Sequence, residues 1–494
     1  MSPDGAAAYD GDGASRGEFS SDPNTGTSTL MSASTTVAKA LQAQLRGSVC
    51  GADGEEFETL RRVWNGAIDR RPCAIARCAD VRDVQFALQV ARDHGVGVTV
   101  RGGGHSVAGL AVRDGAVLLD LAGMRNISVD PHARVAAVEG GALWRDVDAA
   151  TAATGLATTG GLISTTGVGG FTLGGGAGWL MRRYGLACDN LIAAHVVLAD
   201  GRSMRVAADE HPDLYWGLRG GTGGLGVVTR FEFRLHAVAQ VLAGLVVFPL
   251  DQSTAVLRRF REFALEAPEE FCGMVALTSA PPFPFVDSAC HGRTACIAAV
   301  CWAGDVSAGE RALEPIRSAG TPLGQAIAPM PYPQWQQMLD PSAPPGRHHY
   351  WKSINFASLS DAAIDRIALA ARSLPTPVTE LHVQHMGGAV TRTPSSECAF
   401  GHRNVQFFVN LIGAAPEKSH YEATRAWIRN LHGQLSVEAL GGRMPNFADD
   451  DDQDAIARFG KENAERLQGL RRRYDPDGLF AATRQTGAGR LGEI

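Results

Sequence analysis

A run of three glycines directly after a valine-rich segment constrains this chain more than any other feature. Residues 101–106 read Arg-Gly-Gly-Gly-His-Ser and follow the apolar run at residues 96–100. Successive glycines remove every Cβ from a turn, so backbone N–H groups can crowd against a bulky anion, and the preceding strand holds the turn in place. The sequence therefore predicts an anion-binding loop that ends at His105. Taken alone, His105 also fits an ordinary turn or core histidine.

A second glycine-rich segment occupies residues 160–178, about 60 residues downstream, and runs on into Arg-Tyr-Gly-Leu-Ala-Cys-Asp-Asn at residues 183–190. Two separate glycine-rich backbone surfaces suit a ligand that is long as well as charged. A dinucleotide is the obvious case.

A third glycine cluster, residues 221–226, satisfies the G-x-G-x-x-G pattern of the Rossmann fold. That fingerprint requires a helix to follow and an acidic residue about 20 positions later, and the sequence has neither. Residues 227–235 instead alternate apolar and charged side chains, which predicts a strand. We therefore reject a Rossmann domain.

Local patterns predict several other elements. Asp80 and Asp83 begin a helix that Gly95 ends, and residues 191–198 and 203–207 form a hairpin. Residues 350–353, 381–385 and 406–410 are interpreted as strands of one sheet. Apolar positions between Ile456 and Tyr474 predict a single C-terminal helix.

Four segments, in this order along the chain, closely resemble the berberine-bridge-enzyme-like flavoproteins. They are the Arg-Gly-Gly-Gly-His-Ser loop, the second glycine run, Tyr-Gly-Leu-Ala-Cys-Asp-Asn and residues 218–229. These flavoproteins belong to the vanillyl-alcohol oxidase/p-cresol methylhydroxylase superfamily, and the resemblance extends from about residue 72 to the C-terminus. It implies an α+β fold. A two-part FAD-binding domain of the p-cresol methylhydroxylase type would carry an α+β substrate domain whose antiparallel sheet covers the flavin.

The expected organisation has four parts. Residues 1–35 form a disordered tail, 36–240 the FAD-binding domain, 241–441 the substrate-binding domain, and 442–494 a segment that returns to the FAD-binding domain.

The resemblance implies FAD bound covalently through His105 to the flavin 8α-methyl carbon. Many relatives use a cysteine as a second tether, but the corresponding position here is Ile163, so a single tether is expected. The expected cofactor-binding residues are Arg101, Gly102, Gly103, Gly104, His105, Ser106, Gly109, Thr166, Gly167, Gly170, Gly174, Gly175, Gly178, Asp189, Asn190, Val228 and Asn446.

Thr166 occupies the position that gates oxygen in the family, where valine accompanies oxidases and leucine dehydrogenases. Threonine has the shape of valine, which favours an oxidase. Plant relatives carry tyrosines at the positions of Val107, Ala177 and Met444. Their loss implies a roomier, apolar pocket for a bulky hydrophobic substrate.

Candidate catalytic residues are Lys352, Tyr184, Gln384 and Asn410. Lys352, Gln384 and Asn410 come from the strands expected to roof the flavin. Lys352 either is desolvated there and accepts a proton, or is solvated and takes no part in catalysis. Alternation places His382 and Gln384 on one face of their strand, but the sequence does not say which face meets the flavin. Tyr184 either acts in catalysis or packs beside the cofactor.

Composition narrows the function classes. The net charge of −6 offers no basic stripe for nucleic acid. Nine scattered cysteines without a C-x-x-C pair indicate free thiols in a reducing cytoplasm and no metal site. The first ~35 residues lack a signal-peptide pattern, and Met31 is an alternative start. No apolar run reaches the ~18 residues that span a membrane. We expect a cytoplasmic monomer or homodimer.

Together these features predict an FAD-dependent oxidase that removes a hydride from a C–OH or C–N carbon of a bulky, largely apolar small molecule, in secondary metabolism, with O2 as acceptor. The alternatives are a flavin-dependent dehydrogenase, an oxidative cyclase or desaturase, and a catalytically silent flavin- or metabolite-binding protein. Oxygen uptake separates the first alternative, and a flavin that no candidate substrate reduces would identify the last.

Overall fold

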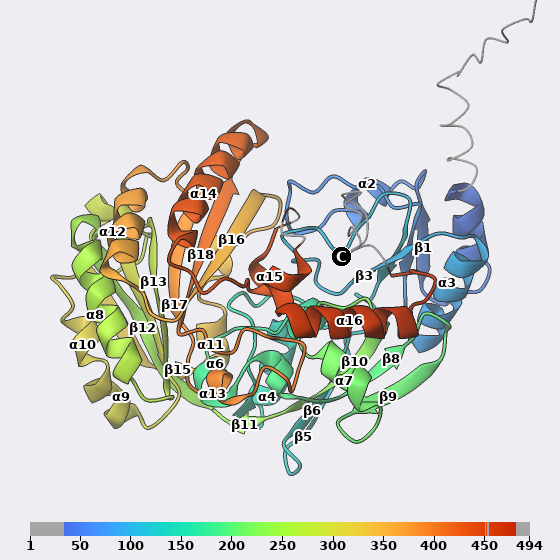
Figure 1. Ribbon diagram of the computed structural model, residues 1–494, viewed down its shortest axis with the longest axis horizontal. Coiled ribbons are helices and arrows are strands. Elements are labelled where there is room, and N and C mark those ends of the chain that lie inside the picture. The colour runs from blue at the N-terminus through green and yellow to red at the C-terminus, as the bar shows by residue number, and fades with distance from the viewer. Residues whose placement is uncertain (1–33, 450, 452–453, 481–494) are drawn as a thin grey trace, which may run out of the picture.

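The strands of this chain gather into three main sheets in a computed structural model, which describes residues 34–449, 451 and 454–480. Two lobes lie side by side (Figure 1). One lobe contains the two smaller sheets and both glycine-rich segments, and the other contains a seven-stranded sheet covered by helices. The expected α+β class is confirmed.

A four-stranded sheet adjoins the first glycine loop, which follows its strand β3. Its strand order is β1-β2-β4-β3, with β2 and β3 both parallel to β4. The bounds are β1 (Ser48–Gly51), β2 (Ala74–Arg77), β3 (Val98–Arg101) and β4 (Val117–Asp120). Helix α3 (Val81–Asp93) connects β2 to β3, and the Asp80 carboxylate caps it by accepting from the N–H groups of Arg82 and Asp83. Asp83 instead accepts from the N–H groups of residues 46, 47 and 79.

A five-stranded antiparallel sheet has the order β5-β6-β10-β8-β9. Its strands are β5 (Ile127–Asp130), β6 (Val135–Glu139), β8 (Leu191–Val197), β9 (Ser203–Ala207) and β10 (Val227–Arg234). The β8–β9 hairpin and the β10 strand after the third glycine cluster are confirmed. A two-stranded pair, β7 (Leu156–Ala157) with β11 (His236–Ala237), lies beside it.

Short helices follow this lobe's strands. They are α2 (Phe57–Leu60), α4 (Trp144–Ala152), α5 (Val168–Leu173), α6 (Met181–Tyr184), η1 (Ala187–Asp189) and α7 (Pro212–Leu218). The second glycine segment thus contains helix α5, which begins after Gly167 and ends at Gly174.

The second lobe is built on one antiparallel sheet of order β15-β12-β14-β13-β17-β18-β16. The strands are β12 (Gln240–Pro249), β13 (Phe271–Ser279), β14 (Thr294–Trp302), β15 (Gly324–Pro331), β16 (His348–Phe356), β17 (Glu380–His385) and β18 (Phe407–Ala415). The three strands that we predicted to share a sheet, β16, β17 and β18, are neighbours in it.

Helices cover one face of this sheet. The long ones are α8 (Ser253–Glu266), α12 (Asp361–Ala370) and α14 (Tyr421–Ser436). The shorter helices between residues 250 and 420, not all of them on that face, are η2 (Leu250–Gln252), η3 (Ser288–Cys290), α9 (Val306–Ala312), α10 (Glu314–Arg317), α11 (Tyr332–Gln336), η4 (Asp340–Ser342), η5 (Ala371–Ser373), α13 (Ala389–Arg392) and η6 (Lys418–His420).

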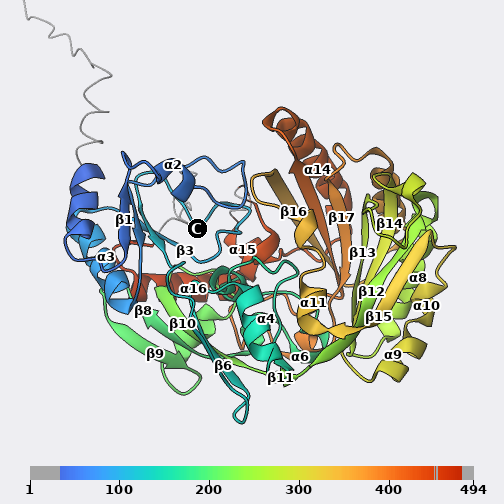
Figure 2. The same ribbon diagram turned by 180° about the vertical axis from the view of Figure 1, so that it is seen from behind.

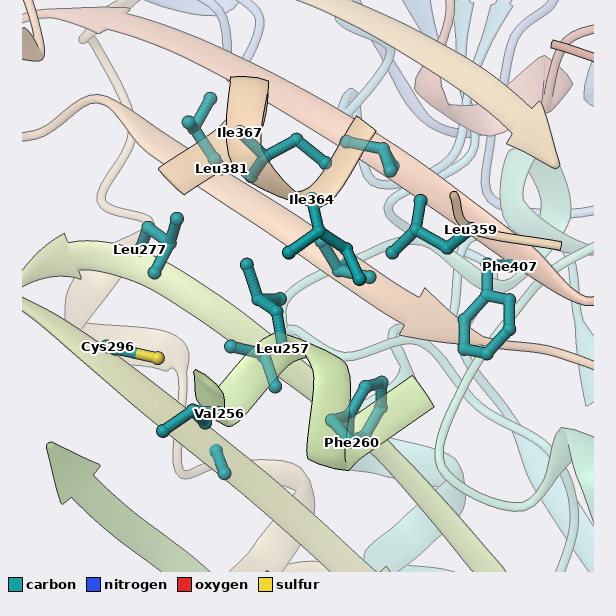
Figure 3. Close-up of a cluster of buried hydrophobic side chains, with 14 of the residues drawn as sticks. Val256, Leu257, Phe260, Leu277, Cys296, Leu359, Ile364, Ile367, Leu381 and Phe407 are labelled. Atoms are coloured by element: carbon teal, nitrogen blue, oxygen red, sulfur yellow. The ribbon is translucent and has the colours of Figure 1, made fainter. Parts of the chain in front are cut away.

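The core under these helices fixes which side chains point toward them. Phe260 of α8 and Ile367 of α12 pack against Leu381 of β17 and Phe407 of β18 (Figure 3). Leu411 of β18 belongs to the same cluster. Successive strand residues alternate between faces, so residues 382, 384, 408 and 410 point to the opposite face.

The opposite face of the sheet packs toward the first lobe. Met274 of β13 and Phe408 of β18 share a buried cluster with Trp179, Phe400 and Met444. Arg182 of α6 also joins the lobes, since its guanidinium donates to the carbonyl oxygens of residues 267, 268, 271 and 386. Helix α11 contacts α4 at the junction, as Figure 2 shows from behind.

The C-terminal segment crosses back to the first lobe, where α16 lies along its surface (Figure 1). It comprises η7 (Pro445–Phe447), α15 (Ala455–Phe459) and α16 (Lys461–Tyr474). Our prediction of a single helix from Ile456 to Tyr474 is wrong. Gly460, at φ +81°, separates α15 from α16, and Ile456 is largely exposed.

Within the described residues, no helix is long and apolar enough to cross a membrane. The same part of the chain holds no group of three or more His, Cys, Asp or Glu side chains arranged to bind a metal ion.

Candidate functional site

A cavity of about 300 Å³ runs between the glycine-rich segments and ends beneath the seven-stranded sheet. The 102–106 loop, the second glycine segment and the 222–228 loop line most of it. Trp351 of β16 and Phe447 of η7 line it on the side of the sheet.

The two glycine segments touch through their backbones at the centre of the cavity wall. A Cβ on Gly103 would lie 2.3 Å from the amide nitrogen of Gly167, and a Cβ on Gly167 would lie 2.2 Å from that of Gly103. Heavy atoms do not approach so closely without displacement, so neither position accepts a side chain. A Cβ on Gly102 would lie 3.0 Å from the carbonyl oxygen of Gly140.

Eleven of the expected cofactor-binding residues line this cavity. They are Gly102, Gly103, Gly104, His105, Ser106, Thr166, Gly167, Gly170, Gly174, Val228 and Asn446. Segments about 60 to 344 positions apart in sequence therefore converge on one surface.

The other six expected cofactor residues do not line it, and four of these hold neighbouring segments in place. Arg101 donates to Asp120 Oδ2 at 2.8 Å, and Asp189 accepts both ends of the Arg403 guanidinium. Asn190 donates to the carbonyl oxygens of Tyr184 and Leu186. A Cβ on Gly178 would lie 1.7 Å from the carbonyl oxygen of Gly160.

The remaining two, Gly109 and Gly175, have φ values of +68° and +108°. Glycine satisfies a backbone requirement at both positions. Each of the six therefore has a structural reason for its residue type, in the folding of the glycine-rich segments and their neighbours, and none contacts the cavity.

The His105 side chain lies at the cavity wall with one ring nitrogen engaged. Its Nε2 is 3.0 Å from the hydroxyl oxygen of Thr165. Burial lowers the pKa of His105 to about 4, so the imidazole is neutral near pH 7. A neutral ring offers a lone pair on one nitrogen, which is the form that acts as a nucleophile.

Trp64 stacks on His105, with ring centroids 5.1 Å apart and an interplanar angle of 17°. It also stacks on His349 of β16 at 4.1 Å and 16°. The backbone N–H of Trp64 donates to the Gly104 carbonyl, and the neighbouring Asn65 side chain bonds both the 107 carbonyl and the backbone of His349. The Trp64–Asn65 segment therefore fastens the glycine loop to the second lobe.

His349 makes stability depend on pH. Burial, aided by nearby Arg347, lowers its pKa to about 3, whereas an unfolded histidine titrates near 6.5. Between pH 3 and pH 6.5 the unfolded chain binds more protons at this histidine than the folded chain does. The contribution of neutral His349 to the unfolding free energy is therefore complete above about pH 6.5 and is lost as the pH falls toward 3.

We expect His349→Phe to flatten this dependence. From pH 7 to pH 5 the native imidazole should account for about 2 kcal/mol of lost unfolding free energy, measured by urea titration at each pH. The variant also loses the 3.2 Å hydrogen bond from Trp351 Nε1 to His349 Nδ1, which lowers the unfolding free energy equally at pH 7 and pH 5. His132→Phe, in an exposed turn, is the control. Equal slopes for wild type and His349→Phe would contradict this account.

Gln384 and Asn410 point from the sheet toward the first lobe. Gln384 pairs in register with Met274 and Phe408, and Asn410 pairs with His382 and Ser353. Gln384 Nε2 and Asn410 Oδ1 are buried and find no hydrogen-bond partner among the described residues. A buried polar atom without a partner costs about 1–3 kcal/mol, which marks both atoms as positions for a ligand or water.

Lys352, a candidate catalytic residue, does not line the cavity. Lys352 shares its face of β16 with Tyr350 and Ile354, which lie in the core under the helices. Its Nζ donates to Asp451 Oδ1, beside Arg429 of α14. The sheet itself separates this ammonium group from the cavity, which argues against Lys352 as a base there.

Tyr184 also lies outside the cavity lining. Its ring stacks on His236 at 3.9 Å, with the Arg183 guanidinium 5.3 Å from the ring centroid. These contacts pack Tyr184 against His236 and Arg183, away from the cavity lining.

Sequence reasoning missed Trp64, Thr165 and His349, which gather around His105. No local pattern marks them, because each gains its role from a contact across at least 41 positions of the chain. Thr165 lies within the second glycine-rich segment, but nothing in that segment distinguishes it from its neighbours.

Asn446 joins the C-terminal segment to the glycine run. Its Oδ1 accepts from the Gly176 N–H at 2.9 Å, and its Nδ2 donates to the carbonyl oxygen of Phe171 at 3.2 Å. The positions where plant relatives carry tyrosine hold small or apolar side chains: Ala177 lines the cavity, and Val107 and Met444 are buried.

Comparisons with known proteins match two regions of the chain that contribute residues to this site. Residues 72–207 match the family model of an FAD binding domain, and residues 445–484 match the model described as berberine and berberine like. An FAD-linked oxidoreductase of Dictyostelium discoideum is 28% identical, over 88% of this chain and 93% of that protein.

Oxidases are among the relatives and among the solved structures that this chain resembles. (R)-6-Hydroxynicotine oxidase of Paenarthrobacter nicotinovorans is 27% identical over 88% of this chain and 95% of its own. The crystal structure of 6-hydroxy-D-nicotine oxidase from Arthrobacter nicotinovorans superposes with a TM-score of 0.78, covering 88% and 97% of the two chains at 26% identity. Glucooligosaccharide oxidase of Acremonium strictum, whose structure reveals a novel flavinylation, gives 0.77 at 25% identity, covering 90% and 96%.

The fold, the glycine cradle and the matched domains define an FAD-binding oxidoreductase. Within that class, the chain is similar to the berberine-bridge-enzyme-like FAD-linked oxidoreductases, in agreement with the two matched regions and with the relatives above. It is an enzyme, and its relatives include oxidases.

Proposed function

We propose that this enzyme is an oxidase that holds FAD through a single covalent bond to His105 and oxidises a bulky, largely apolar small molecule of secondary metabolism. Bound FAD would accept a hydride from a C–OH or C–N carbon, and O2 would take up the electrons as hydrogen peroxide. The arrangement of His105 beside a cradle that excludes side chains is the observation that carries this proposal.

The residues present fit FAD. Gly103 and Gly167 leave no room for a Cβ, so their backbones form a close wall that suits a pyrophosphate approached by N–H groups. Val228 and Thr99 line another part of the cavity, and Trp351 and Phe447 line the part beneath the sheet. A dinucleotide would lie along these parts of the cavity, with its ring system toward the sheet.

The substrate pocket would lie between the flavin and the seven-stranded sheet. Leu162, Ile163, Ala177, Trp351 and Phe447 make the nearby lining apolar. Since Ala177 stands where plant relatives have a phenol, substrates would be held by apolar contact. Gln384 Nε2 and Asn410 Oδ1 are unpartnered and face this lobe, although neither residue lines the cavity, and they would bind a polar group of a substrate that reaches beyond it.

Thr166 tests the choice between oxidase and dehydrogenase. It lines the cavity next to the glycine wall. We expect Thr166→Leu, whose larger side chain fills the space beside the flavin, to slow reoxidation by O2 about tenfold or more, equivalent to about 1.4 kcal/mol of barrier. Thr166→Val keeps the shape and should stay close to wild type.

The measurement is stopped-flow mixing of photoreduced enzyme with oxygenated buffer, followed at the flavin absorbance, with hydrogen peroxide assayed as product. Slow reoxidation of the wild-type protein by O2, with fast reoxidation by a quinone, would instead identify a dehydrogenase. A flavin that reoxidises in air yet is reduced by none of a panel of apolar alcohols and amines would favour the binding protein.

A further inference from the structure

The strongest unexplained feature of the site is the set of contacts that orient His105. The Thr165 hydroxyl contacts Nε2, and the Trp64 indole stacks on the ring face. We propose that Thr165 and Trp64 are positioning residues for flavin attachment, and that the Thr165 contact directs bond formation to Nδ1. This inference rests on the proposed tether at His105 and adds to it.

The Thr165 hydroxyl is held where it stands. The Ser164 N–H donates to Asp340 Oδ1 at 2.8 Å, and the Ser164 hydroxyl donates to Oδ2 at 2.5 Å. On the other side, the N–H of Trp144 donates to the Thr166 carbonyl at 3.0 Å. Anchors on both flanking residues fix the hydroxyl, and a fixed partner restricts the imidazole to one orientation.

Trp64 removes the remaining freedom of the ring. A histidine side chain with one hydrogen bond can still tilt about that bond, and a stacked indole opposes the tilt. Trp64 is itself held, because its Nε1 donates to the Ala343 carbonyl at 3.0 Å and its backbone N–H donates to the Gly104 carbonyl at 3.1 Å. Trp64 and the 101–106 loop that carries His105 are therefore held together by hydrogen bonds and ring stacking.

A hydroxyl suits both protonation states that attachment requires. Before attachment, Nε2–H donates to Thr165 Oγ1, which leaves the lone pair on Nδ1. After Nδ1 has formed its bond, Nε2 carries the lone pair and the Thr165 O–H donates to it. The same 3.0 Å contact thus serves the ring throughout, and the low pKa of His105 opposes a charged product.

The overall step balances with O2 as the oxidant. One N–C bond forms between Nδ1 and the 8α-methyl carbon, one C–H bond of that methyl group breaks, and the imidazole releases its Nε2 proton. Two electrons are removed from the reacting pair and reach O2 through the flavin. With the two protons they give one hydrogen peroxide per tether formed.

The test compares Thr165→Val with Thr165→Ser, and Trp64→Leu with Trp64→Phe, in the full-length protein. The covalent fraction is read by intact mass as isolated and during incubation with added FAD. Valine keeps the shape of threonine but loses the hydroxyl, and serine keeps the hydroxyl. We expect attachment to slow about tenfold or more in Thr165→Val and Trp64→Leu, with serine and phenylalanine restoring it.

Attachment in Thr165→Val as fast as in wild type, or in Thr165→Ser as slow as in Thr165→Val, would overturn the role of the hydroxyl. Non-covalent FAD retained after gel filtration, together with an unchanged melting temperature, separates slow attachment from failure to fold. If Thr165→Val misfolds, the Trp64 pair decides the question. A wild-type chain without covalent flavin refutes the tether itself, before any variant is compared.

Discussion

Gly103→Ala is expected to abolish FAD binding. The added Cβ would stand 2.3 Å from the amide nitrogen and 2.6 Å from the Cα of Gly167, both backbone atoms that cannot rotate away. The two glycine segments must separate to admit it, and the wall of the cavity separates with them. The measurement is the flavin content of the purified protein, from its absorbance spectrum, together with its melting temperature.

Gly469→Ala is the matched control, because a Cβ there meets nothing within 4 Å on the surface of α16. In a helix this change should raise stability by about 0.5–1 kcal/mol and leave flavin content unchanged. A Gly103→Ala protein that retains full flavin content would show that the contact between the glycine segments does not shape the cofactor site.

Arg403→Met is expected to destabilise the fold by about 3–5 kcal/mol, because it leaves a buried carboxylate without its partner. Arg403 donates to both carboxylate oxygens of Asp189, at 2.7 and 2.8 Å, and the two side chains are 5% and 9% exposed. The pair joins the segment before β18 to η1 across 214 positions of the chain. Arg219, 3.5 Å from the same carboxylate, compensates only in part.

The change in unfolding free energy is measured by urea titration at pH 7. Asp189→Asn in the Arg403→Met background should recover part of the loss, since it removes the uncompensated charge. Arg202→Met breaks a pair with Asp200 that is 69% and 51% exposed, and should cost less than about 1 kcal/mol. Similar losses for Arg403→Met and Arg202→Met would contradict the assignment of Asp189 to a structural role.

The loops of this site could be predicted because runs of glycine mark places where the backbone must approach another group closely. The turn before His105 and the run around Gly167 both stand in the cavity wall. The 227–235 segment was predicted to be a strand because its alternation has period two, and β10 confirms it. Each of these signals lies within about ten residues of sequence.

The orientation of the sheet could not be predicted in this way. Alternation separates Lys352 from its neighbours Trp351 and Ser353, but it does not say which set meets the helices. That choice is made by α14, whose Arg429 contacts Tyr350 from the same side as Lys352. The pairing of Asp189 with Arg403 could not be predicted for a related reason, because Arg403 lies 214 positions away in sequence. The C-terminal helix was overextended because the apolar spacing continued across Gly460.

The central claim is that FAD is attached to this chain at His105 alone. The most direct measurement is denaturing electrophoresis of wild type and His105→Ala, viewed under ultraviolet light before staining. The account predicts a fluorescent wild-type band and a dark His105→Ala band at equal protein load. A dark wild-type band, or fluorescence that persists in His105→Ala, would contradict it.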